Sequence, residues 1–344
     1  MPGDTVTKEG MDKVKVICLT PVRNEAWILD KFLRCTSLWA DHIIIADQMS
    51  TDGSREIAKK FSKVTLINNA SNTFNEPERQ KLLIDEARRI SGRLLLVTLD
   101  ADEIFTPNVL SSPEWKTILA SPPGSIFKFQ WANLQPDMRS MWLAGHFAWG
   151  YMDDGFEHSS QSKIHTGRIP LPSSHNVIVL NQIKVIHFQY TSWIRMQSKH
   201  RWYQCFEKVN VFNRSELDLF RTYHHMYGLS QSQTKAIPLD WIQGYNDLGI
   251  DITSIIVESR NYFDEQVLAL LEHHGAHTFK KLSIWDLDWV EKAKVYGRTN
   301  LDVYKDPRTR WDRYIHRYLV KTQPKCNKLI FRLIDLFIKS VFRY

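Results

Sequence analysis

The stretch Leu94–Glu103, LLLVTLDADE, decides the fold. An apolar run without alternation is typical of a strand that is buried on both faces, as in a parallel sheet. The run ends in three acids, Asp100, Asp102 and Glu103. Carboxylates at the border of a core are costly unless something positive binds them. Because Mg²⁺ and Mn²⁺ take carboxylate oxygens, this strand end is a candidate metal site.

Strands and helices are expected to alternate upstream of this stretch. Strands are predicted at 14–19, 42–46 and 64–68, and helices are predicted to end near 38, 61 and 90. Short links between alternating elements predict an α/β, doubly wound, mostly parallel sheet. Ligands of such sheets bind outside the carboxyl ends of the strands. The polar clusters all fall at those ends; they are 23–25, 47–52 and 100–103.

Three sequence pieces resemble a known family. TPVRNE (20–25), IIIADQMSTDGS (43–54) and ERQKLLIDEARRISGRLLLVTLDADE (78–103) look like the nucleotide-binding half of family 2 inverting glycosyltransferases of the GT-A fold, of the bacterial glycan or lipopolysaccharide-assembly type. The resemblance covers about residues 14–107. It implies a nucleotide-sugar donor and a bound Mn²⁺ or Mg²⁺. Gln48 departs from the family, which commonly has a second Asp there, and Glu103 replaces an Asp.

The resemblance also implies roles for individual residues. The nucleoside would be surrounded by Pro21, Arg23, Glu25, Asp47 and Asp52. The diphosphate would lie near Arg79, and the metal and the sugar nucleotide would be held by Asp100 and Asp102. Asp47 would accept a hydrogen bond from the base.

Several of these residues have a simpler explanation. Asp52 could be a turn or capping residue, and Glu25 could favour the positive end of the following helix. Arg79 could pair with Glu76 or Glu86 on one helix face. A purely structural role is least expected for Asp102, where the reaction needs the developing charge of a diphosphate leaving group to be neutralised.

Inversion needs a carboxylate that takes the proton of the acceptor hydroxyl. The family places this base downstream of the Asp-x-Asp, and the acidic cluster in that region contains Asp153, Asp154 and Glu157. We expect Asp154 or Glu157 to be the base, with an ordinary acidic loop as the alternative. His187 ends a strand-like run and is either a metal ligand or a structural histidine.

Composition bounds the other expectations. Four scattered cysteines, without metal-site spacing, indicate a reducing compartment. The first residues are polar, so no signal peptide is expected, and no segment has the apolar length of a membrane span. No G-x-G-x-x-G follows the first strand, which disfavours a dinucleotide oxidoreductase.

The basic excess of the chain lies at its end. Residues 298–344 carry twelve Lys or Arg and four Asp, whereas the whole chain has a formal charge of +7. In the tail 325–344, charged residues recur every three or four positions on an otherwise apolar helix. We expect this helix to bind an anionic membrane surface, with docking on its own domain or on a twin subunit as the alternative. Nucleic acid is not expected, because it would leave the apolar side chains exposed.

Together these patterns predict a catalytic domain over 1–230 and a helical region over 231–344. The nucleotide-sugar half would span about 14–107 and the acceptor half about 125–230. The aromatic residues of 184–228 would form either an acceptor site or core. The predicted function is metal-dependent transfer of a sugar to a glycan or lipid-linked acceptor in the cytoplasm, peripherally on the inner face of the cell membrane. The alternative is an inactive nucleotide-binding homologue that acts as a membrane-associated interaction protein.

Overall fold

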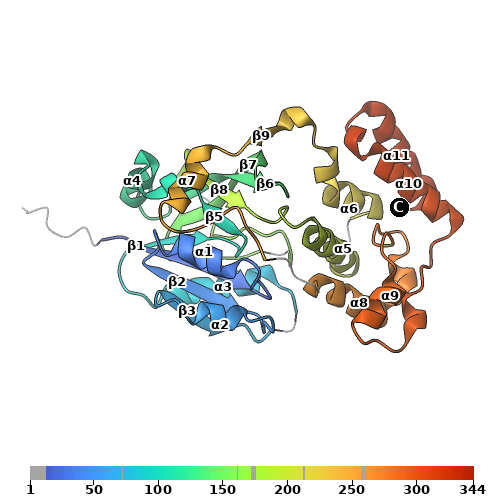
Figure 1. Cartoon of the computed structure of the whole chain (residues 1–344), viewed down its shortest axis with the longest axis horizontal. Coiled ribbons are helices and arrows are strands. Elements are labelled where there is room, and N and C mark those ends of the chain that lie inside the picture. Colours follow the sequence, from blue (N-terminus) through green and yellow to red (C-terminus); the bar gives the residue numbers. More distant parts are fainter. Residues whose placement is uncertain (1–12, 72, 161, 172–175, 212–213, 257–260) are drawn as a thin grey trace, which may run out of the picture. The chain divides into compact units, whose positions relative to one another are not determined.

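The computed structural model describes residues 13–71, 73–160, 162–171, 176–211, 214–256 and 261–344 (Figure 1). The chain forms two compact units. One comprises Met1–Thr191 with Ala236–Val257, and the other comprises Ser192–Lys235 with Glu258–Tyr344. The predicted boundary at 230 is therefore wrong, because 192–235 belongs with the helical part and 236–257 returns to the first unit.

The first unit is built on one mixed sheet. In its described residues the strand order is β3-β2-β1-β4-β7-β6-β8-β5. β1, β2, β3 and β4 pair in parallel, whereas β7 is antiparallel to both β4 and β6. The bounds are β1 Lys15–Val22, β2 His42–Asp47, β3 Val64–Asn68, β4 Leu94–Thr98, β5 Glu103–Phe105, β6 Ile126–Leu134, β7 Ser140–Met152 and β8 Val177–His187. The predicted α/β fold with a mostly parallel nucleotide-binding half is confirmed.

Helices cover both faces of the parallel strands, and the two-residue period of each strand decides which side chain meets which helix. On β1, Val16 and Cys18 pack into the same core as Phe32 of α1 (Leu29–Thr36). Ile17 and Leu19 point to the other face, into the core that Leu83 of α3 shares. Buried strands with both faces covered explain why these runs are apolar without alternation.

The remaining helices of the first unit are short. They are α2 Ser54–Ala58, α3 Glu76–Ala87, α4 Pro113–Ala120 and α7 Leu239–Asn246, with a 3₁₀ turn η1 at Pro107–Leu110. Three rings fill the space beneath α4: Trp39, Phe105 and Trp115 lie with centroids 4.9–6.3 Å apart. Tyr245 of α7 donates its hydroxyl to the Phe105 carbonyl at 2.5 Å. These contacts anchor β5, the short strand that begins at Glu103.

The second unit is helical. Its helices are α5 Trp193–Asn210, α6 Glu216–Tyr223, α8 Tyr262–His274, α9 Trp289–Val295, α10 Arg310–Thr322 and α11 Leu329–Phe342. Short 3₁₀ turns join them at η2 His225–Gly228, η3 Gln231–Gln233, η4 Ala276–Phe279, η5 Leu301–Tyr304 and η6 Gln323–Lys325, and β9 Thr234–Ala236 follows η3. None of the helices in the described part of the chain has the length and apolar character needed to cross a membrane.

Much of the aromatic-rich stretch of the second unit is core. Trp202, Phe220 and Tyr223 are buried, and the Trp202 ring lies 5.5 Å from that of Phe263 on α8. Of the two explanations of this stretch, packing accounts for these side chains.

A partly buried ion pair fixes α11 to α6. Arg221 donates from Nε and Nη2 to the two oxygens of Asp335 at 3.0 and 2.9 Å, and Nη2 also donates to Thr322 Oγ1. Tyr318 of α10 donates to the same carboxylate at 3.1 Å. Beside this network, Ile338 packs into a small core that Phe220 and Leu319 share. The one acid of the tail is therefore an internal anchor.

Replacing Asp335 with Ala leaves the Arg221 guanidinium without its carboxylate in a partly buried place. We expect the free energy of unfolding of α11 to fall by about 3 kcal/mol. Amide hydrogen exchange across 329–342 measures this change. In the control, Asp30→Ala removes one member of an exposed pair with Arg34, and should change the free energy of unfolding by under about 0.5 kcal/mol. Unchanged exchange in the Asp335 variant would show that the pair does not hold α11.

Candidate functional site

The carboxyl ends of β1, β2 and β4 carry the candidate residues. β2 ends at Asp47, and Asp100–Glu103 follows β4 and leads into β5. Register also aligns three polar residues across the other half of the sheet. Glu103 is opposite His187, and His187 is opposite Asn133. The topology therefore brings the acids that follow β4 to the end of β8.

Arg168 holds two of the three acids together. Its Nη1 lies 2.5 Å from Glu103 Oε2, and its Nη2 lies 2.7 Å from Asp100 Oδ2. Glu103 Oε2 also accepts from the Asp100 amide, and Glu103 Oε1 accepts from Trp131 Nε1 at 2.8 Å. Glu103 is fully buried. Its hydrogen bonds make it the internal support of the acidic turn rather than an outward-facing ligand.

The electrostatics of this pair are those of a buried acid with one cation. Burial raises the pKa of Glu103 to about 7, and the Arg168 guanidinium opposes that rise. Burial by itself would lower the pKa of Arg168, but the carboxylates of Asp100 and Glu103 raise it above the ordinary value of arginine. Arg168 therefore stays charged and is the cation on which the acidic turn depends.

Asp102 lies beside His187. Asp102 Oδ2 is 3.7 Å from His187 Nε2, and both residues are buried. His187 Nδ1 lies 2.7 Å from Asn133 Oδ1, which only accepts, so Nδ1 carries the proton. Nε2 is therefore the ring nitrogen on the side of Asp102. The ring also stacks on Trp131, with centroids 4.7 Å apart and planes 7° apart.

This pair fits a divalent cation that is shared with a ligand. A histidine whose second nitrogen is fixed by an outer hydrogen bond is a typical metal ligand, and Mg²⁺ or Mn²⁺ is commonly held by one or two carboxylates together with substrate phosphates. Within the described residues no group of three or more His, Cys, Asp or Glu could hold a metal ion. Asp102 and His187 could therefore supply part of the coordination, with Asp100 on the other side of the turn.

Asp47 has one oxygen bound and one available. Its Oδ2 accepts from Arg55 Nη1 at 2.6 Å and from the Ser50 amide at 3.3 Å. Its Oδ1 is buried and has no hydrogen-bond partner in the structure. An unsatisfied buried acceptor is costly, and a ligand N–H would satisfy it. This is what the predicted contact with a base requires.

Asp52 and Glu25 are both engaged within the protein. Asp52 Oδ1 accepts from the amide and hydroxyl of Ser54, and Oδ2 accepts from the Ala26 amide at 2.8 Å. Glu25 accepts from Trp27 Nε1 at 2.6 Å and lies just before α1. These contacts favour the turn and helix-start explanations. Half-buried Pro21 and Arg23 lie beside them, at and after the end of β1.

Gln48, which departs from the family pattern, serves the fold. Its side-chain amide donates to the carbonyls of Ser71 and Thr73 at 2.8 and 3.0 Å, and so fixes the loop after β3.

Arg79 contacts its own helix. Its Nη2 lies 3.6 Å from Glu76 Oε1, and its guanidinium lies 4.9 Å from the Phe74 ring centroid. Glu76 in turn accepts from Thr166, two residues before Arg168. The helix-face pairing with Glu76 is therefore present, and the cation nearest to the acids is Arg168 rather than Arg79.

The predicted base cluster begins at the opposite edge of the sheet. The Asp153 amide donates to the carbonyl of Leu94, the first residue of β4, because β7 runs antiparallel to β4. Leu94 begins β4, whereas Asp100 follows its last residue, Thr98, so the length of the strand separates that point from the acidic turn. Asp153 binds Arg88 at 2.8 and 3.1 Å, and Asp154 accepts from the Tyr151 hydroxyl. These contacts disfavour Asp153 and Asp154 as the base, which the sequence predicts to be Asp154 or Glu157.

Glu157 is exposed in the loop that leads away from this edge. Its neighbour Phe156 still accepts from Arg88 at 2.7 Å, whereas His158 Nε2 lies 2.7 Å from the carbonyl of Gly167, next to Arg168. The loop thus leads from one edge of the sheet to the other, and Glu157 remains a prediction.

Sequence reasoning missed Arg168, Asn133 and Trp131. Arg168 lies 65 residues after Glu103 in a loop without a motif, so nothing in the local sequence marks it. Asn133 and Trp131 belong to β6, whose register with β8 places them beside His187. Only the strand pairing reveals these neighbours, and strand register cannot be read from composition.

An aromatic cluster borders the site. The Trp131 ring lies 4.7 Å from Phe147 and 5.0 Å from Trp149, and Arg168 lies 5.3 Å from the Trp149 ring centroid. Phe147 is 41% exposed, whereas Trp149 is buried. The cluster therefore presents one exposed ring beside the acidic turn and its cation.

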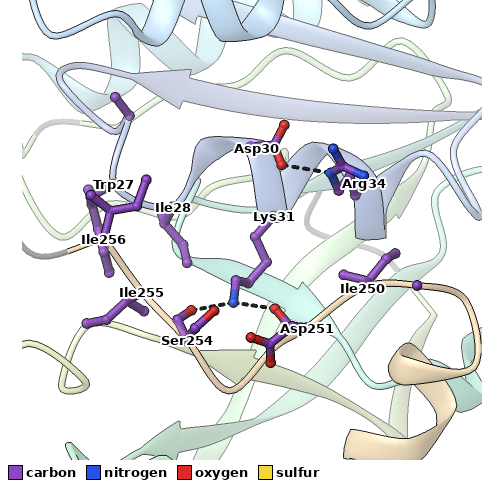
Figure 2. A pocket seen from close by; sticks show the side chains of 12 residues that line it. Trp27, Ile28, Asp30, Lys31, Arg34, Ile250, Asp251, Ser254, Ile255 and Ile256 are labelled. Carbon is purple, nitrogen blue, oxygen red and sulfur yellow. Dashed lines mark hydrogen bonds and ion pairs between the residues drawn. The ribbon is translucent and has the colours of Figure 1, made fainter.

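A separate cavity of about 280 Å³ lies between α1 and the segment 249–256 (Figure 2). Lys31 is directed to the carbonyls of Asp251 and Ser254, and Trp27, Ile250 and Ile256 contribute apolar walls. None of Asp100, Asp102, Glu103 and His187 lines it. Through these two hydrogen bonds Lys31 joins the segment 249–256 to α1.

Comparison with known proteins gives one family match. Residues 18–113, a little over a quarter of the chain, match the model of glycosyl transferase family 2. This region contains most of β1, all of β2 to β4, Asp47 and the acidic turn. Among curated proteins, none matches the chain.

Two solved structures illustrate the structural similarity. Glucosyl-3-phosphoglycerate synthase from Mycobacterium tuberculosis, in complex with Mn²⁺, UDP and phosphoglyceric acid, is 18% identical over 34% of this chain and 43% of its own, with a TM-score of 0.26. Mannose-1-phosphate geranyltransferase from Thermus thermophilus is 14% identical over 43% of this chain and 51% of its own, with a TM-score of 0.27. At these TM-scores neither similarity carries an argument about this chain.

Replacing Arg168 with Gln removes the cation from the buried Glu103. At about pH 9 we expect the free energy of unfolding to fall by about 3 kcal/mol, because the Glu103 carboxylate is then charged and unpaired or must take up a proton. At about pH 6, below the raised pKa of Glu103, the carboxyl is largely protonated in both proteins and the difference should shrink. Urea unfolding at both pH values measures it, and a loss that does not grow with pH would contradict the assignment.

Proposed function

We propose that the protein is an inverting, metal-dependent glycosyltransferase that moves a sugar from a nucleoside diphosphate to a glycan or lipid-linked acceptor. One observation carries the proposal. Asp102 and His187, 3.7 Å apart, lie beside the Arg168-bound acidic turn, at the sheet edge where α/β proteins bind ligands. The family match over 18–113 supports the same reaction class.

Asp47 would select the base of the donor. Its buried Oδ1 has no partner, and Arg55 binds Oδ2 and so orients the carboxylate. A base that presents an N–H, as uracil does, would satisfy this oxygen. A base that presents a lone pair at the same place would be repelled by the carboxylate. Pro21, Arg23 and Glu25 would lie around the nucleoside, and Asp52 would hold the turn that carries them.

The diphosphate would lie between Asp102 and Arg168. Asp102 and His187, with Asp100 close by, would hold a divalent cation, which would supply positive charge to the diphosphate leaving group. Arg168 offers a second positive charge and stays protonated beside its two carboxylates. The buried Glu103 keeps Arg168 and Asp100 in place, so the site would need little rearrangement when a donor binds.

The acceptor would meet the aromatic cluster. Phe147 presents an exposed ring next to Trp131 and Trp149, and sugar rings pack their C–H faces on such surfaces. A glycan or a lipid-linked glycan at the inner face of the cell membrane fits this arrangement, and would place the enzyme peripherally on the cytoplasmic side.

The second candidate function is a nucleotide-binding homologue without transfer activity. It is favoured by one observation: Asp153 and Asp154, the acids nearest to Glu157, are engaged at the far edge of the sheet. A protein of this kind would bind a nucleoside diphosphate with metal but would neither hydrolyse nor transfer the donor.

Calorimetry with UDP, GDP, CDP and dTDP, with and without Mn²⁺, tests the donor site. We expect one nucleotide to bind only with metal. Asp102→Asn should abolish the binding that metal promotes. Asp47→Asn should weaken nucleotide binding about tenfold or more, because its amide presents donors or a neutral oxygen to the base. Asp41→Asn, at the other end of β2, is the matched control. Metal-independent binding of every nucleotide would overturn the proposal.

Replacing Glu157 with Gln tests the base. We expect kcat to fall at least about a hundredfold with donor affinity unchanged, because the proton of the acceptor hydroxyl then has no carboxylate to take it. In the matched control, Asp153→Asn removes an acid at the far edge and should leave kcat close to that of the wild type. An unaffected Glu157 variant would exclude this residue from the reaction.

A further inference from the structure

The last two long helices form an antiparallel pair in the second unit (Figure 1). The Trp311 ring, at the start of α10, lies 5.9 Å from Phe342 at the end of α11, and Tyr318 donates to Asp335 in the middle. The two helices therefore present one common outer surface.

Two members of the charged stripe of α11 bind the neighbouring helix. Asp335 is bound by Arg221, and Lys339 donates to Asp218 of α6 at 2.6 Å. These contacts use the polar positions that an amphipathic helix normally presents to water. As a result, the apolar positions face outward.

Nine large apolar side chains of this pair are exposed. Leu329 and Trp311 are exposed by 72% and 65%, and the others exceed half. The set, here called the outer face, is Trp311, Tyr314, Val320, Leu329, Ile330, Leu333, Leu336, Phe337 and Val341. Most of the nine lie on α11 and at the start of α10, which scattered surface residues do not account for, and large exposed apolar patches mark interaction surfaces.

The charge around the outer face is mainly positive. Exposed cations of the two helices and their connection are Arg310, Arg313, Arg317, Lys321, Lys325, Lys328, Arg332 and Arg343. In 309–344 the acids are Asp312 and Asp335, and both are buried, Asp312 beside Thr309 and Tyr344. The surface thus offers aliphatic and aromatic groups among mainly positive charges. Two partly exposed carboxylates lie beside it: Asp306, 3.5 Å from Arg313, and Asp218, which binds Lys339.

We propose that the outer face of α10 and α11 binds an anionic lipid bilayer, with its apolar side chains in the acyl boundary and the surrounding cations on the headgroups. Charge decides between the possible occupants. A second copy of this surface would bring eight exposed cations against eight, whereas phosphate headgroups complement them. Trp311 and Tyr314 are residues that favour the interface between headgroups and acyl chains.

This binding goes beyond sugar transfer and does not depend on it. It involves residues of the second unit alone, so it needs no nucleotide and no metal. Failure of donor binding would leave it standing, and failure of vesicle binding would leave the donor site unaffected.

Cosedimentation of the full chain with vesicles tests the proposal. Vesicles of phosphatidylcholine alone are compared with vesicles that also contain phosphatidylglycerol. We expect binding to the anionic vesicles that weakens as salt is raised, because salt screens the headgroup attraction. Equal partition to both kinds of vesicle, or to neither, would overturn the proposal.

Two sets of variants separate the apolar and the charged parts. Leu333→Glu with Phe337→Glu should abolish sedimentation with anionic vesicles, whereas the matched pair Leu239→Glu with Leu248→Glu, exposed in the first unit, should not. Lys321, Lys325 and Lys328 replaced by Gln should weaken partitioning roughly a hundredfold. The same change at Lys59, Lys60 and Lys116, exposed elsewhere, should have little effect.

Circular dichroism and light scattering complete the test. Because the replaced side chains are exposed, helix content and the unfolding midpoint should match those of the wild type. A wild-type dimer that the Leu333 and Phe337 variant turns into a monomer, without vesicle binding by either, would assign the outer face to a second copy and overturn the membrane proposal.

Discussion

The ion pair between Arg168 and the buried Glu103 is the interaction on which the candidate site depends. A fully buried carboxylate cannot stay charged without a cation, and Arg168 provides it from a loop far along the chain. The same guanidinium fixes Asp100, and Glu103 fixes the indole of Trp131, which stacks on His187. One buried charge pair thus links the acidic turn, the histidine and the aromatic cluster.

The parallel half of the fold could be predicted from sequence because its signals are local. The strand predicted at 64–68 has the observed bounds of β3, and the unbroken apolar run identifies β4. Asp47, Asp100 and Asp102 stand out in the sequence for the same reason, since each lies at or just after the end of a buried strand. The structure places these three at one edge of the sheet, as the alternation of strands and helices predicts.

The rest could not be predicted because it depends on strand direction and register. Placing Asp153 and Asp154 near the acidic turn assumes a parallel strand before them, but β7 is antiparallel and ends at the other edge. Arg168 and Asn133 reach the site through long-range pairing that leaves no local mark. In the tail, the helical period identifies the charged stripe but not which of its members are bound, because only Arg221 and Asp218 on another helix show that Asp335 and Lys339 point inward.

The pairing of β6 with β8 has a consequence for how this chain tolerates change. Their register shifts between Lys128 and Gln130, where β8 carries extra residues, and only beyond that irregularity does His187 come opposite Asn133. Losing one residue from this stretch would put the side chain of Phe188, or a backbone turned to the wrong face, where the imidazole now lies. The chain should therefore tolerate substitutions in 179–184 better than a change in the length of this stretch. Deleting a single residue there should disturb the position of His187 more than most substitutions do.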